Sequence, residues 1–132
     1  MIGRAPRLRG ERGSAVVEFT LVSVVLVAVF LAVLQFGFVI HVRNTLVACA
    51  AEGARHAANA DRGLAEGEAR TAALIGSALS PSLAGEVRSR TVSVNGVQMV
   101  EITVTTTLPL FGLLGVDRGL TVVGHAVEES AL

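Results

Sequence analysis

The chain has 132 residues, of which 52% are hydrophobic, and its formal net charge is zero. A chain of this length builds at most one small domain beside a membrane segment. Its basic residues flank an apolar run instead of forming a patch on a folded domain, which excludes the electrostatic footprint of a nucleic-acid-binding protein. The single cysteine, Cys49, excludes an intramolecular disulfide and a multi-cysteine zinc site.

The N-terminal third predicts a membrane helix. The first thirteen residues carry four arginines against one acid, Glu11, and no charge occurs from Phe19 to Ile40. As a helix that uncharged run is about 33 Å long, at about 1.5 Å per residue, which is enough to cross a bilayer core. The arginine excess before the run, with only Arg43 close behind it, predicts a cytoplasmic N-terminus and an outer C-terminal part.

Two other kinds of N-terminal segment compete with this interpretation. A cleaved secretory signal should have an apolar region of about 7–15 residues, so this run is too long for one. The tetrapeptide Leu46 to Cys49, "LVAC", resembles a lipobox, but a lipobox should close the apolar region directly, and here His41 and Arg43 intervene. Cys49 is therefore expected to be a small apolar residue on a helix face.

A carboxylate stands close to the start of the apolar run. Gly13 is followed by Ser14, and Glu18 directly precedes Phe19. An ionised carboxylate costs roughly 2.5–3.5 kcal/mol at the centre of a bilayer and less at its edge. One explanation is that Glu18 sits among the lipid headgroups in the first helical turn, where the helix dipole favours an anion.

The order of these elements suggests another explanation. A short basic leader, then Gly13, then Glu18-Phe19 and an apolar run resembles the processing site of type IV prepilins of the Flp subclass. The chain continues "QFGFVIHVRNTLVACAAEGARHAA", from Gln35 to Ala58, and this looks like the signature of TadE-like proteins, minor pseudopilins of the tight-adherence (Flp) pilus system. The resemblance covers Gly13 to Ala58.

The resemblance implies how the protein is processed and what it contacts. A prepilin peptidase would cut between Gly13 and Ser14 on the cytoplasmic side, and the new Ser14 amine would meet Glu18 of a neighbouring helix. The implied partners are the lipid bilayer, the peptidase, other pilin or pseudopilin helices and the Tad assembly platform. Ser14 stands where many type IV pilins have Phe, so N-methylation is not expected, and Gln35 replaces a frequent Glu.

The helical pattern continues past Arg43 to about residue 60. Ala50, Ala54 and Ala58 recur at four-residue spacing, and such a small-residue stripe permits close helix packing. The stripe fits either packing against another pilin helix or docking against the chain's own sheet. The pattern does not decide between the two.

Enzyme chemistry is not expected. His41, Cys49 and His56 lie seven to eight residues apart, and a rise of about 10–12 Å between them prevents their sharing one metal ion. His125 stands alone in a predicted strand, so we expect a histidine on the sheet surface. We predict no catalytic residue, no metal and no cofactor.

The C-terminal half predicts a helix followed by a small sheet. Residues 64–79 read as a second short helix, which Pro81 ends. The Val- and Thr-rich stretch 86–110 has a period of two and contains Asn95-Gly96, a hairpin signal. Because a two-residue loop would place the apolar faces of the two strands on opposite sides, we expect a three-residue loop, Val94 to Gly96. An apolar loop follows over 109–119, whose Phe111, Leu113 and Leu114 are expected to cover the core, with a contact surface as the alternative. A third strand follows over 120–128.

These elements predict an α+β protein with a long transmembrane α-helix that continues into a juxtamembrane helix, a second short helix and an antiparallel sheet of about three strands. We expect a basic leader over 1–13, a helix over 14–60 and a small extracytoplasmic domain over 61–132. The predicted function is that of a minor pseudopilin in the cytoplasmic membrane, and possible entry into the pilus is left open. The alternatives are an unprocessed, membrane-anchored binding module and a pseudopilin of a secretion or DNA-uptake system.

Overall fold

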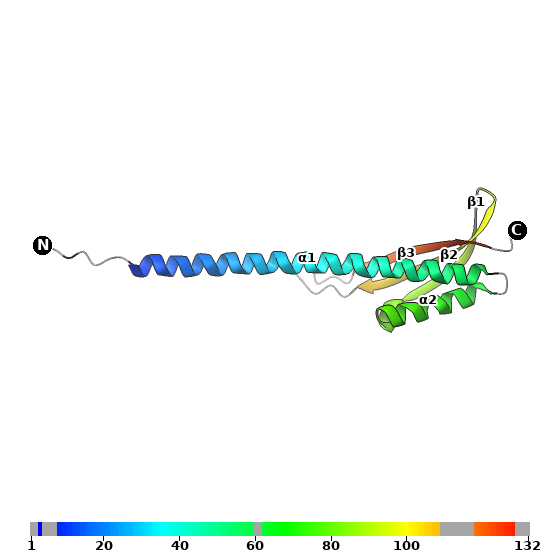
Figure 1. Cartoon of the computed structure of the whole chain (residues 1–132), viewed down its shortest axis with the longest axis horizontal. Coiled ribbons are helices and arrows are strands. Elements are labelled where there is room, and N and C mark those ends of the chain that lie inside the picture. The colour runs from blue at the N-terminus through cyan, green and yellow to red at the C-terminus, as the bar shows by residue number, and fades with distance from the viewer. Residues whose placement is uncertain (1–2, 4–7, 60–61, 109–117, 129–132) are drawn as a thin grey trace. The chain divides into compact units, whose positions relative to one another are not determined.

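The structure is a computed structural model that describes residue 3 and residues 8–59, 62–108 and 118–128. Its elements are α1 (Leu8–Ala58), α2 (Leu64–Ala78), the 3₁₀ turn η1 (Pro81–Ala84), β1 (Glu86–Val94), β2 (Val97–Leu108) and β3 (Arg118–Val127) (Figure 1). This confirms the predicted α+β class, with one long apolar helix, a second helix and three antiparallel strands. The expected core-covering loop lies outside the described residues except for its last two positions, which begin β3.

The chain divides into two compact units, residues 1–37 and 38–132. Helix α1 contributes to both, because the division falls at Gly37 within it. The second part of α1 therefore belongs to the same compact unit as α2 and the sheet. The expected boundaries at residues 13 and 60 concern cleavage and the membrane, and they stay predictions.

The sheet has the order β1-β2-β3, and both strand pairs are antiparallel. Its inner face carries the β2 residues Val100, Ile102 and Val104, none more than 1% exposed, together with Val122 of β3. These pack with the α1 residues Val42, Leu46, Cys49, Ala50, Ala54, Ala57 and Ala58 and with Ile75 of α2 in one core. The alternation expected for the third strand is confirmed, since Val122 and Gly124 are buried and Val123 and His125 exposed.

The expected three-residue hairpin loop is wrong. Val94 pairs with Val97, and the two-residue loop consists of Asn95 at φ 52° and Gly96 at φ 81°. Two successive residues with positive φ are typical of the type I′ turn, whose twist matches that of the flanking strands. The turn geometry therefore sets this register, although it places polar residues of β1 on the inner face of the sheet.

Glycines allow the elements of the compact unit to approach closely, and Figure 1 shows α2 beside the C-terminal part of α1. A Cβ atom on Gly67 of α2 would lie 2.9 Å from the carbonyl oxygen of Gly53 on α1. On β3, a Cβ atom on Gly124 would lie 2.4 Å from the backbone nitrogen of Ala51. Neither contact leaves room for a side chain, so the helices and the sheet meet at backbone distance.

Candidate functional site

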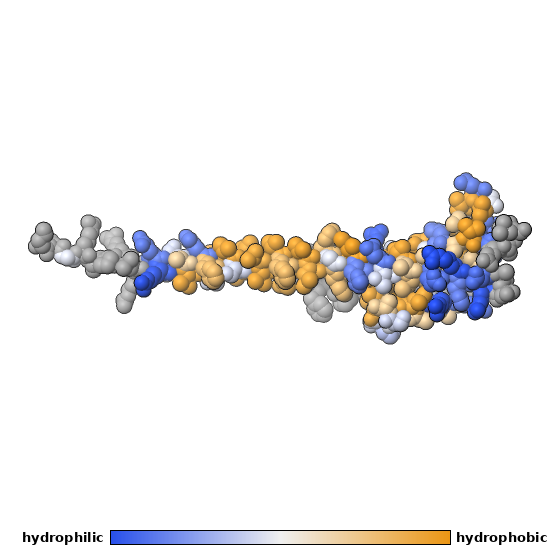
Figure 2. Space-filling view, in the orientation of Figure 1, coloured by the Kyte–Doolittle hydropathy of each residue, from blue (hydrophilic) through white to orange (hydrophobic). Residues whose placement is uncertain are grey.

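The apolar part of α1 has no cover from the described chain. Every large apolar side chain from Val16 to Phe36 is at least 48% exposed, and Phe19 reaches 74%. Figure 2 shows this continuous apolar surface along the helix. Among the described residues, one helix is long and apolar enough to cross a membrane by length and composition. An exposed apolar surface of this size marks a contact with a partner protein or with a membrane. The length of the apolar run of α1 matches the thickness of a bilayer core.

The predicted processing residues lie near the beginning of this helix. Gly13, Ser14, Glu18 and Phe19 are all helical and all exposed. Ser14 and Glu18 are four residues apart, so they share one face of α1. Glu18 forms no hydrogen bond or ion pair with any described residue. Its carboxylate therefore lies at the start of an apolar surface without a compensating charge from the described residues.

The hydroxyl group of Thr20 is satisfied within the helix. Its Oγ1 atom donates to the carbonyl oxygen of Val16 at 2.8 Å. A threonine within a helix commonly satisfies its hydroxyl group by such a bond to a carbonyl oxygen of the preceding turn. Thr20 therefore differs from Glu18, for which the helix supplies no such partner.

The small-residue stripe is buried within the chain. Ala50 and Ala54 are 0% exposed and Ala58 is 2% exposed, all inside the core of the C-terminal unit. Of the two alternatives that the sequence left open, the structure shows docking against the chain's own elements. The sequence analysis did not identify Gly67 and Gly124, the glycines that face α1, because their contacts join segments far apart in the chain.

A charged cluster crosses the outer face of the sheet. Glu101 on β2 accepts from Nε of Arg90 on β1 at 2.6 Å, and its second oxygen lies 2.8 Å from Nε2 of His125 on β3. The bonds from Arg90 and then His125 hold the pKa of the Glu101 carboxyl below its usual 4.5. His125 is thus a surface histidine as expected, and its partner Glu101 lies on the neighbouring strand, 24 residues earlier in the sequence.

The described residues contain no group of three or more His, Cys, Asp and Glu side chains that could hold a metal ion. Cys49 is buried in the core, and burial raises the pKa of its thiol. His41 is exposed and His56 is half-buried. That the protein is not an enzyme stays a prediction.

The apolar helix makes the protein a candidate for single-pass membrane anchoring, and this defines its class. The profile of the TadE-like protein family matches residues 13–55, about a third of the chain, and this agrees with the resemblance found in the sequence. The match suggests a part in the Tad/Flp pilus system. Comparisons with curated proteins and with solved structures give no match.

Proposed function

We propose that the protein is a minor pseudopilin of a Tad/Flp-type pilus system, cut by a prepilin peptidase after Gly13 and held in the cytoplasmic membrane by α1. The observation that carries the proposal is the placement of Gly13, Ser14 and Glu18 on one exposed stretch of helix, directly before an uncovered apolar surface and inside the family match. The arginine-rich N-terminus supports a cytoplasmic leader and an outer C-terminal unit.

The helix must open locally before a peptidase can cut it. Gly13 lies inside α1, in the second turn after the helix begins at Leu8, and a Cβ atom added there would meet no other atom within 4 Å. A glycine in a helix interior is less favourable than alanine by about 1 kcal/mol. Gly13 therefore lowers the cost of unwinding at the position where the chain must extend into the protease.

Cleavage gives the unpaired carboxylate a partner. It leaves Ser14 with a positively charged amine, one turn before Glu18 on the same face. Four residues of helix rise about 6 Å, so a parallel neighbour shifted by about one turn places its Glu18 beside that amine. A buried ion pair of this kind fixes register better than it adds stability. Glu18 is therefore an assembly residue in this proposal.

The proposal is tested by blocking the cut. Gly13→Leu in the native host should leave the precursor at full length and abolish pilus formation, while Gly10→Leu, three residues upstream, should be processed normally. Efficient processing of the Gly13→Leu precursor would contradict the proposed site. A periplasm-active reporter fused after Leu132 should be active, and a cytoplasm-active reporter there should be silent.

A further inference from the structure

The two edges of the sheet differ. On β1, the backbone N–H of Ser89 points away from β2 and donates to Oε1 of Glu68 on α2 at 2.8 Å. The Glu68 side chain thus covers the β1 edge at Ser89. Protection of edge strands by charged side chains is common in β-proteins. The edge at β3 has no comparable partner among the described residues.

The direction of the backbone groups on β3 follows from one hydrogen bond beyond the end of the strand. Glu128 N donates to the carbonyl oxygen of Gln98 at 3.0 Å, in register with the β2–β3 pairing. In an antiparallel pair, successive residues point their N–H and C=O groups alternately toward and away from the partner strand. The residues whose groups point away from β2 are therefore Gly119, Thr121, Val123, His125 and Val127. None of the described residues pairs with the backbone donors and acceptors of this row.

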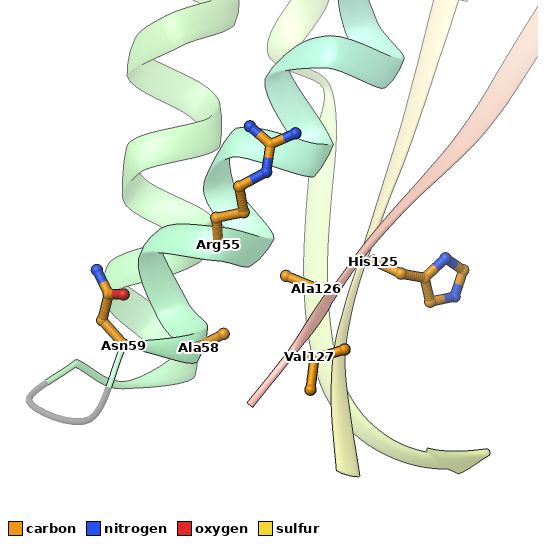
Figure 3. Close-up of a pocket in the computed structure, with 6 residues that line it drawn as sticks. All are labelled: Arg55, Ala58, Asn59, His125, Ala126 and Val127. Atoms are coloured by element: carbon orange, nitrogen blue, oxygen red, sulfur yellow. The ribbon is translucent and has the colours of Figure 1, made fainter. Parts of the chain in front are cut away.

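A pocket adjoins the C-terminal end of this edge. It has a volume of about 330 Å³ and is lined by Arg55, Ala58, Asn59, His125, Ala126 and Val127. Figure 3 shows Arg55 and Ala58 on α1, Asn59 directly after its end, and the ring of His125 on the other side of β3. Of the described residues that line the pocket, Arg55 is the cation on the inner side, and none is a carboxylate. Its side chain is 68% exposed and Glu52 occupies only one of its five N–H donors.

We infer that β3 binds an extended strand of a different protein, which pairs with this edge and places an acidic side chain in the pocket beside Arg55. Strand addition supplies affinity through main-chain hydrogen bonds and specificity through alternate side chains. A residue opposite Ala126 faces the inner side, where Arg55 and Asn59 are the polar groups. A guanidinium and an amide select a carboxylate there.

A second copy of the chain that pairs through the length of its own β3 does not supply that carboxylate. Of the β3 residues whose side chains the structure describes, Leu120, Val122, Gly124 and Ala126 face inward, and none of them is acidic. Pairing along the length of two β3 strands would therefore place an apolar group opposite Ala126. The inference does not depend on cleavage at Gly13, because every residue that carries it lies in the C-terminal unit.

The test is photo-crosslinking of the full-length protein in membranes of the native host. A benzoylphenylalanine replaces Val123 on the free edge or, as the control, Arg88 in the same row of the same face on the opposite edge. We expect at least tenfold more crosslinked product from position 123, with mass spectrometry identifying a segment of another protein that contains Asp or Glu. Arg55→Glu should lower this yield at least tenfold, and Arg70→Glu on α2 should not.

Three results would overturn the inference. They are an equal or absent product from positions 123 and 88, a crosslink from position 123 to β3 of a second copy, and a yield that Arg55→Glu leaves unchanged. Arg55→Glu alters an exposed side chain, so the amount of folded protein in the membrane, measured by protease resistance, serves as the reference for every yield.

Discussion

Ser89 on β1 and Glu68 on α2 form two hydrogen bonds at the inner side of the sheet. The Ser89 hydroxyl lies 2.6 Å from the Glu68 carboxylate, and the Ser89 backbone N–H donates to the same oxygen at 2.8 Å. A polar residue thus takes a position that an apolar one usually occupies, opposite the fully buried Ile102. Because the Glu68 carboxylate accepts both hydrogen bonds, it offsets the free-energy cost of placing Ser89 on the inner face of the sheet.

Replacing Glu68 by alanine should therefore destabilise the C-terminal unit by about 1–3 kcal/mol, the cost of leaving partly buried donors without an acceptor. Urea denaturation of the detergent-solubilised protein, followed by circular dichroism, measures this change. Glu66→Ala is the matched control on the same helix, because the contact of Glu66 among the described residues is an exposed ion pair with Arg62. Such a pair contributes about 0–1 kcal/mol. Equal effects of the two substitutions would contradict the structural role of Glu68.

The same contact explains where sequence reasoning failed. Alignment of the apolar residues favours a three-residue loop, because the two-residue loop places Ser89 opposite Ile102. Glu68, more than twenty residues earlier in the sequence, accepts the hydrogen bonds of this serine, and an alignment of apolar residues carries no information on that contact. The helix and strand periods and the third strand were predictable, because they depend on neighbours along the chain. The Glu101 cluster and the glycine contacts join distant segments, so local pattern could not show them.

Gly124→Ala should destabilise the C-terminal unit by about 1–3 kcal/mol, since the new methyl group would overlap the backbone of α1 at Ala51. No flexible side chain can move aside there. Gly119→Ala in the same strand is the control, because a Cβ atom at Gly119 meets nothing within 4 Å. Denaturation midpoints of the two variants give the comparison. A Gly124→Ala protein as stable as the control would show that α1 and β3 do not approach at this point.

The Glu101 cluster predicts a dependence of stability on pH. Because the folded-state pKa of Glu101 lies below 4.5, its contribution to stability is present above pH 4.5 and is lost as the pH falls through the lower folded value. Glu101→Gln should remove this part of the acid destabilisation. Unfolding curves between pH 3 and 6 test it, with Glu52→Gln as the exposed control. An unchanged pH profile in Glu101→Gln would contradict the pairing with Arg90 and His125.

Glu18→Val separates the two roles considered for this carboxylate. If Glu18 is only a headgroup-region residue, the substitution is harmless, because removing a charge eases membrane insertion. If it pairs with a neighbour's Ser14 amine, the change leaves that amine unpaired, at a cost of about 3–5 kcal/mol. We predict an inserted and cleaved protein that does not support pilus assembly, with partial activity for Glu18→Asp. Electron microscopy of surface pili checks this, and normal pili from Glu18→Val would assign Glu18 to the headgroup region.

The central claim is that the chain is processed as a pseudopilin, and the most direct test is the N-terminal residue of the mature protein. Intact mass and N-terminal sequencing of the protein purified from membranes of the native host determine it. The account predicts a chain that begins at Ser14. A mature protein that begins at Met1 would instead indicate an unprocessed membrane-anchored module, one that begins at Cys49 would indicate a lipoprotein, and either would contradict the account.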